Sequence, residues 1–151
     1  MATNTILQYL DQANSDGEDY GFPSNRQQKE TFIASEAISD GDLVCLDISK
    51  TSDGDKMLHI KKLKTDAGLT AVAIGVANEA IASGDSGEVV IRGFKADANI
   101  ATGAAVGERF VGTSTAGRGD VLANSSTLPA LGYVITTASA NQADVYIIKQ
   151  F

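Results

Sequence analysis

The sequence has few of the residues on which metal and nucleophilic chemistry most often depends. Its 151 residues include one cysteine, one histidine, two prolines and no tryptophan. Because His59 is the only histidine, a zinc site built from several histidines is excluded. Cys45 lies in the apolar run 43–46, so we interpret it as a buried structural thiol. No phosphate-binding loop or dinucleotide fingerprint is present, and we predict no cofactor and no metal site.

Positive charge and long apolar runs are also scarce. Twelve Lys and Arg residues stand against 19 Asp and Glu, a net charge of −7, whereas nucleic-acid binding depends on clustered cations. The one basic cluster alternates with apolar residues, which is typical of the solvent side of a strand: Lys56, Lys61, Lys62 and Lys64. No run approaches the ~18 apolar residues of a membrane span, and no charged-then-apolar leader opens the chain. We expect a soluble protein that binds neither nucleic acid nor membrane.

A short element that occurs three times, at 37–42, 80–85 and 99–104, is the clearest pattern present. Each copy places an isoleucine three residues before a glycine and is followed by a β-prone stretch. Isoleucine can pack into a core, and glycine allows the positive φ of a tight turn. The glycines Gly41, Gly84 and Gly103 lie 43 and then 19 residues apart, which argues against a solenoid of fixed period. The element indicates turns that open strands.

The character of the chain changes near residue 30. Residues 1–30 are polar and acidic with few β-formers, and they predict an extended, largely irregular N-terminal arm. One short amphipathic helix is expected over 4–13, too short to persist in water without docking. The apolar residues through which the arm would dock are Ile6, Leu7, Leu10, Tyr20 and Phe22.

Residues 31–151 predict one all-β domain. Candidate strands cover 31–34, 42–49, 56–64, 69–77, 87–94, 108–112, 119–123, 130–137 and 143–150. In the second of these, Val44, Leu46 and Ile48 share one face and Asp47 lies on the other. A hairpin turn at 52–55, built on Asp53-Gly54, is expected to join it to the third. This pattern is typical of a small antiparallel β-sandwich or β-barrel, and it leaves the choice between them open.

Three further motifs invite a sharper function. Residues 84–87 (Gly-Asp-Ser-Gly) match the nucleophile motif of chymotrypsin-like proteases, and His59, Asp66 and Ser86 follow the triad's chain order. That family's double barrel needs a longer chain, so we interpret the motif as a turn entering a strand. Residues 118–120 spell Arg-Gly-Asp and are expected in an exposed loop. The acidic turns 40–42 and 53–55 lack the ligand spacing of an EF-hand, so we predict no metal ligands in them. With the protease motif interpreted as a turn, we also predict no catalytic residues.

Taken in order, several of these segments resemble the small head-decoration, or cement, proteins of tailed bacteriophages. The segments are 37–44, 74–77, 82–93 (Ala-Ser-Gly-Asp-Ser-Gly-Glu-Val-Val-Ile-Arg-Gly), 131–134 (Leu-Gly-Tyr-Val) and 143–147 (Ala-Asp-Val-Tyr-Ile). The likeness covers about residues 31–150. It implies a structural virion protein and not an enzyme, assembled in the host cytoplasm as a homotrimer. Such a trimer would bind the outer surface of the expanded capsid between capsomers and stabilise the head.

This resemblance implies a role for the N-terminal arm in binding the capsid. Fully extended, its 30 residues would span at most roughly 100 Å, enough to reach the major capsid protein or a neighbouring decoration protein. The five apolar arm residues are then the expected capsid contacts. Two alternatives stay open: a head-fibre or tail-fibre domain that binds a host-surface glycan, and a hydrolase built on Ser86.

Overall fold

The computed structural model describes residues 27–64, 73–122 and 130–148. Within these ranges the chain forms nine strands and one short helix, which confirms the all-β prediction. The elements are β1 (Gln28–Ala34), β2 (Leu43–Leu46), α2 (Asp53–Leu58), β3 (His59–Lys62), β4 (Ala73–Ala77), β5 (Ser86–Asn99), β6 (Arg109–Gly112), β7 (Gly119–Val121), β8 (Gly132–Val134) and β9 (Gln142–Ile147). Among the described residues no helix is long and apolar enough to cross a membrane.

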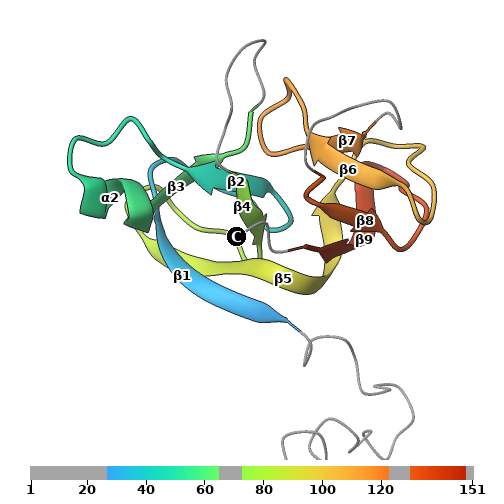
Figure 1. Ribbon diagram of the computed structural model, residues 1–151, viewed down its shortest axis with the longest axis horizontal. Coiled ribbons are helices and arrows are strands. Elements are labelled where there is room, and N and C mark those ends of the chain that lie inside the picture. Colours follow the sequence, from blue (N-terminus) through green and yellow to red (C-terminus); the bar gives the residue numbers. More distant parts are fainter. Residues whose placement is uncertain (1–26, 65–72, 123–129, 149–151) are drawn as a thin grey trace, which may run out of the picture.

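The first five strands close into a barrel (Figure 1). Their order is β1-β3-β2-β4-β5, and β5 pairs back with β1. The β1–β3 pair is parallel, and the other four pairs are antiparallel. Closure removes most free strand edges, which is how small β proteins avoid pairing with other chains.

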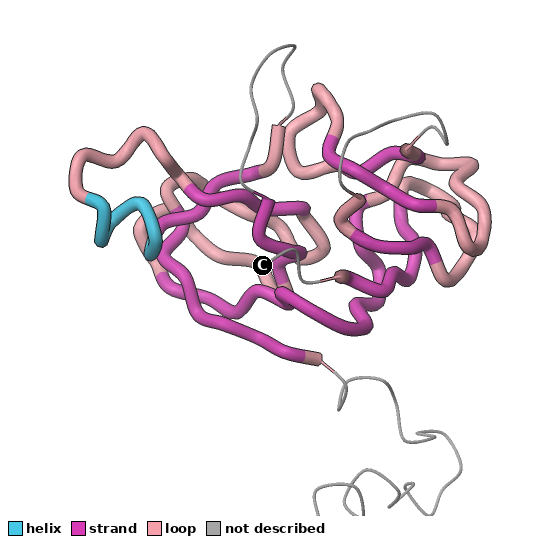
Figure 2. Tube along the Cα trace, viewed as in Figure 1, coloured by secondary structure: helices cyan, strands magenta, loops and turns pink. Residues whose placement is uncertain are grey.

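Strand β5 belongs to the barrel and to a second sheet. It is 14 residues long; its first half pairs with β1 and β4, and from Gly93 onward it pairs with β9. Gly93 has a φ of +98°, and a bulge follows between Lys95 and Ala98, so the strand bends as it leaves the barrel. The second sheet continues in the order β5-β9-β8-β6-β7, as the trace in Figure 2 shows.

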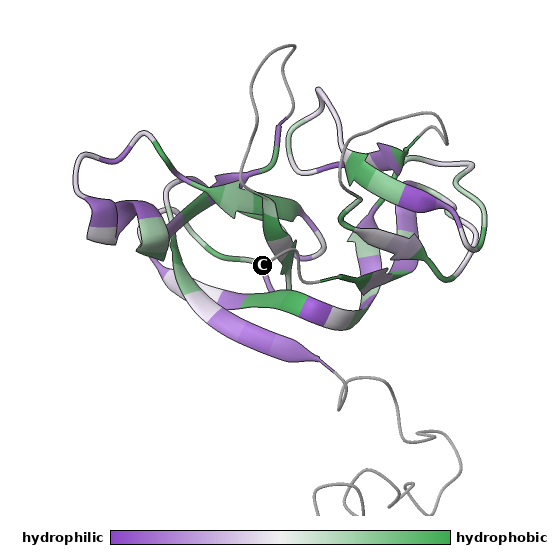
Figure 3. Cartoon of the chain, in the orientation of Figure 1, coloured by the Kyte–Doolittle hydropathy of each residue, from purple (hydrophilic) through white to green (hydrophobic). Residues whose placement is uncertain are grey.

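Two hydrophobic cores result. One fills the barrel with Phe32, Ala34, Ile38, Val44, Leu46, Ile60, Ile74, Ala77, Ile81, Val89 and Ile91. The other, between the barrel wall and the second sheet, includes Leu43, Cys45, Leu63, Val76, Val90, Ile100, Phe110, Leu131, Val134, Val145 and Ile147. Successive side chains of a strand point to opposite faces, so β2 supplies both cores and has no solvent-facing side. Figure 3 shows β2 and β4 in hydrophobic colours and the start of β1 in hydrophilic ones.

The repeated element forms the turns predicted for it. Ile38 and Ile81 are buried, and each donates its backbone N–H to the carbonyl of the other over 2.9 Å. Gly41, Gly84 and Gly103 have φ values of +82°, +88° and +99°. The first two copies are therefore joined to each other at one end of the barrel, whereas the third leads from β5 towards β6 in the second sheet.

The predicted hairpin at Asp53-Gly54 is wrong. Residues 53–58 form helix α2, so the strand predicted over 56–64 is reduced to β3. Ser52 caps this helix by accepting a hydrogen bond from the Asp55 N–H at 3.1 Å, and Lys56 pairs with Asp53 at 2.9 Å. Serine capping with an acidic first turn outcompetes the two-residue hairpin. Strands β2 and β3 still pair antiparallel around the longer connection.

The strand predicted over 42–49 is shorter than expected. Strand β2 ends at Leu46, and beyond it Asp47 is only 5% exposed whereas Ile48 is 53% exposed. Burial alone would raise the pKa of the Asp47 carboxyl. Hydrogen bonds from the Ser49 hydroxyl (2.6 Å) and the Lys61 ammonium (3.3 Å) outweigh that effect and hold the pKa below its usual range. A carboxylate with these partners can be buried although it is charged.

We expect Asp47→Asn to destabilise the protein at neutral pH but much less in acid. Because the folded-state pKa is lowered, the carboxylate stabilises the fold above about pH 5, and this contribution is lost as the pH falls below about 4. The free energy of unfolding in urea should drop by about 1–3 kcal/mol at pH 7, and the difference should shrink at pH 3. Asp53→Asn, in an exposed pair, is the control. An Asp47→Asn cost independent of pH would contradict this account.

Candidate interaction surfaces

The outer face of the second sheet carries a row of large side chains. Tyr133 on β8 lies directly opposite Tyr146 on β9, which in turn lies opposite Phe94 on β5. At the other end Arg109 on β6 lies opposite Tyr133. Directly paired residues share a face, so the four side chains form one continuous row, which we call the tyrosine row.

The tyrosine row is open to solvent although the residues beside it in sequence are buried. Tyr133 and Tyr146 are 42% and 40% exposed, whereas Val134, Val145 and Ile147 belong to the core. Tyrosine is enriched at protein interfaces because its ring is apolar and its hydroxyl is polar. The sheet therefore presents a surface suited to a protein or sugar partner.

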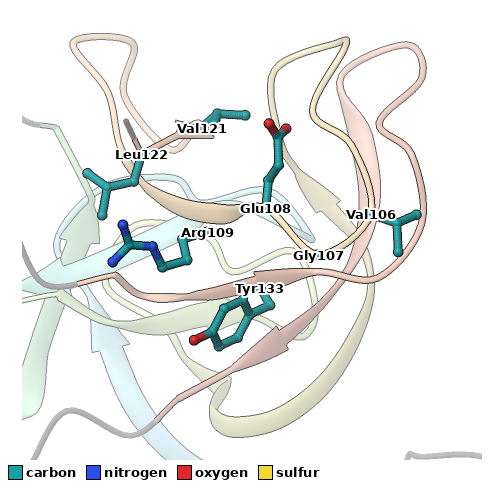
Figure 4. Close-up of a pocket in the computed structure, with 7 residues that line it drawn as sticks. All are labelled: Val106, Gly107, Glu108, Arg109, Val121, Leu122 and Tyr133. Atoms are coloured by element: carbon teal, nitrogen blue, oxygen red, sulfur yellow. The ribbon is translucent and has the colours of Figure 1, made fainter. Parts of the chain in front are cut away.

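A hollow of about 550 Å³ adjoins one end of the tyrosine row (Figure 4). Arg109 lies between Leu122 and Tyr133, and Glu108 lies on the other side of the opening near Val121. The Glu108 carboxylate accepts a hydrogen bond from the backbone N–H of Ala105 at 2.7 Å, which fixes its position. An aromatic ring, a guanidinium and a carboxylate around one opening can hold a polar group that also has an apolar face.

The acidic turn at 40–42 ties the barrel to the second sheet. Asp42 is buried; its carboxylate lies 3.4 Å from the Lys62 ammonium and accepts a hydrogen bond from the Asn99 side chain at 3.1 Å. Asp40 lies 2.9 Å from the ammonium of buried Lys95. These carboxylates already have cationic partners, and the described residues contain no group of three side chains arranged to hold a metal ion.

The prediction that the Arg-Gly-Asp sequence lies in an exposed loop is wrong. Gly119 is buried and begins β7, and the half-buried Arg118 side chain donates to the Asn99 side chain over 3.4 Å. Only Asp120 of the three is exposed. The tripeptide is mostly part of the junction between the barrel and the second sheet.

Of the other residues singled out from the sequence, those of the arm and of the protease-like triad lie partly outside the described residues. The arm residues Ile6, Leu7, Leu10, Tyr20 and Phe22 and the triad candidate Asp66 lie outside the described residues. Ser86 is exposed at the start of β5, and the His59 ring nitrogen Nδ1 lies 2.9 Å from the Asp55 carbonyl oxygen.

Cys45 is buried as predicted. Burial raises the pKa of its thiol to about 11, so the nucleophilic thiolate is scarce at neutral pH. The structure therefore agrees with a structural thiol at this position.

Comparison with solved structures shows a likeness in fold. Neither a family of known sequences nor a curated protein matches the chain. Among solved structures, the chain is similar to the N base of the head fiber gp8.5 of bacteriophage phi29, with a TM-score of 0.54 and 16% sequence identity. The match covers 82% of this chain and 95% of that chain. At this identity the likeness shows a shared fold.

Proposed function

We propose that this chain is a structural protein of a bacteriophage head, and specifically a decoration protein on the outer surface of the expanded capsid. The observation that carries the proposal is the fold shared with a phage head-fibre base. The order of turn and strand motifs along residues 31–150 supports it independently. On this proposal the protein acts as a homotrimer that holds major capsid subunits together across capsomer boundaries.

The proposed attachment uses the N-terminal arm. Ordering a free arm costs about 1–2 kcal/mol per residue, so attachment requires buried apolar anchors along it. Ile6, Leu7 and Leu10 are spaced to enter one groove from a single helical face. The folded body would meanwhile rest on the capsid or on a neighbouring decoration protein.

Cosedimentation with phage heads tests this proposal. The full-length protein should bind expanded heads and not unexpanded ones, and light scattering should give three times the chain mass of 15.7 kDa. Replacing Ile6, Leu7 and Leu10 together by serine should weaken binding by about tenfold or more, because each buried aliphatic side chain contributes about 1.5–3 kcal/mol. Leu58→Ser, at an exposed position of helix α2, is the control. A monomer without affinity for heads would overturn the proposal.

The tyrosine row favours a second candidate, a fibre base that binds a host-surface glycan. Stacked sugar rings need exposed aromatic faces, and Tyr133 and Tyr146 provide two on adjacent strands beside the hollow that contains Arg109. A glycan array would decide: a bound glycan that is lost in Tyr133→Ala and kept in Met57→Ser supports this candidate. Binding that survives Tyr133→Ala would remove it.

A further inference from the structure

A second hollow, of about 680 Å³, lies at the side of the barrel next to helix α2. Its apolar lining comes from five different elements and from Ile48 just after β2: Phe32, Leu46, Ile48, Met57, Ile74 and Ile91. Met57 on α2 is 62% exposed, and Ile48 is also mostly exposed. We call this the barrel hollow. Large apolar side chains that are exposed to solvent together in this way are typical of a docking surface.

The barrel hollow exists because β3 is too short to line β1. Strand β3 has four residues and pairs with β1 only at Ile33 and Ala34. Earlier in β1, Lys29 to Phe32 pair with β5 on one side only. The barrel wall is therefore incomplete beside the first half of β1.

The incomplete wall leaves backbone groups ready to pair. Ala34 exchanges hydrogen bonds with the turn that enters β5, donating to the Asp85 carbonyl (2.9 Å) and accepting from Gly84 (2.7 Å). The direction of these groups alternates along a strand, so the N–H and C=O of Thr31 and Lys29 point away from β5, towards the barrel hollow. In the part of the chain that the structure describes, no strand lies along that side.

We propose that the Tyr20–Phe22 segment of the same chain adds to this side of β1 as an extended strand and places its two aromatic rings in the barrel hollow. Tyr20 and Phe22 are two residues apart, so an extended backbone directs both rings to one face. Main-chain hydrogen bonds to Thr31 and Lys29 would supply affinity, and the apolar lining would supply specificity, as in other cases of strand addition.

The chain length fits an occupant from the same molecule. Four residues separate Phe22 from Gln27, where the described chain begins beside β5, and the five Cα–Cα steps between Phe22 and Gln27 can span up to about 18 Å. The four residues include Pro23, Ser24 and Asn25, which favour turns, so the chain can reverse and run antiparallel to β1. A segment tethered this closely has an effective concentration in the millimolar range, well above that of a second copy in dilute solution.

This inference does not depend on the proposed function, but it narrows the role of the arm. If Tyr20 and Phe22 are held on the body of the free protein, the capsid contacts expected of the arm fall to Ile6, Leu7 and Leu10. The experiments below involve no capsid, so their failure leaves the proposed function standing.

Because the sequence contains no tryptophan, the fluorescence of a single introduced tryptophan can be observed without background from other indoles. In full-length Phe22→Trp the single indole should emit at shorter wavelength than in Val106→Trp, whose position is exposed. Adding Met57→Glu to Phe22→Trp should shift the emission back towards that of the exposed reference, because a charge in the apolar lining expels the ring. Identical emission from the two single-tryptophan variants would overturn the proposal.

A disulfide test identifies the occupant. Under mild oxidation, Phe22→Cys with Met57→Cys should form a bond within one chain, while buried Cys45 stays reduced. The pair Phe22→Cys with Val106→Cys, whose second thiol lies in the segment between β5 and β6 and not beside α2, should stay reduced under the same conditions. Disulfide-linked dimers of the first variant would show that another copy fills the barrel hollow and would overturn the proposal, as would equal bonding in both variants.

Discussion

Gly41→Ala should destabilise the protein far more than Gly84→Ala, although the two glycines occupy equivalent turns of the repeated element. Both have a left-handed backbone, with φ values of +82° and +88°. A Cβ at Gly84 would meet no atom within 4 Å, whereas a Cβ at Gly41 would overlap the carbonyl oxygen of Asp97 in β5. Gly41→Ala therefore incurs both backbone strain and steric overlap, whereas Gly84→Ala incurs backbone strain alone.

The size of each effect follows from these two costs. A left-handed alanine costs roughly 1–2 kcal/mol, which is the expected loss for Gly84→Ala. Overlap with backbone that cannot move freely adds about 1–3 kcal/mol at Gly41. Urea unfolding followed by circular dichroism measures both, and Gly103→Ala, with φ +99° and open space around it, should match Gly84→Ala. Equal losses at Gly41 and Gly84 would show that β5 can withdraw from the turn.

Phe110→Ala should reduce the free energy of unfolding by about 3–5 kcal/mol, the usual cost of a large cavity in a rigid core. Phe110 is fully buried on β6, and its ring packs in the core between the barrel wall and the second sheet. Its contacts include the close approach at Gly132 on β8, where a Cβ would lie 3.0 Å from the ring.

Tyr133→Ala is the matched control for Phe110→Ala. Tyr133 follows Gly132 on β8 and points to the opposite, solvent-facing side of the same sheet. It should change the stability by about 0.5 kcal/mol or less in urea unfolding. A Phe110→Ala cost near that of Tyr133→Ala would mean that the second core contributes little to the fold.

Most strands could be predicted from the sequence because turn glycines and β-branched runs act locally. Strands β6, β8 and β9 lie within or close to their predicted ranges, whereas β5 begins close to its predicted start and runs five residues beyond its predicted end; β8 and β9 pair with each other. Closure of the barrel could not be predicted in the same way. It depends on a parallel pair between β1 and β3, and no turn signal specifies a pair between strands that are not neighbours in sequence.

Two features that the sequence patterns did not reveal share a physical cause, which is hydrogen bonding by side chains. Ser52 turned an expected hairpin into a helix by capping it, and Ser49 with Lys61 made it possible to bury Asp47. Alternating patterns register only polarity, so they do not reveal a polar group that finds its partners inside the fold.

The two candidate surfaces differ in how far the sequence alone predicts them. The tyrosine row could be approached from the sequence, because Tyr133 and Tyr146 lie in two predicted strands, which pair in the structure. The barrel hollow was not, since it depends on where β3 stops. The arm residues named from the sequence stay predictions.

The sharing of β5 between the barrel and the second sheet has a mechanical consequence. A pull on the second sheet travels along the covalent backbone of β5 into the barrel wall, with no flexible linker between them. Because β1 and β9 flank successive halves of that strand, separating the two sheets along it would shear several hydrogen bonds together. We therefore expect the barrel and the second sheet to carry tension together through β5.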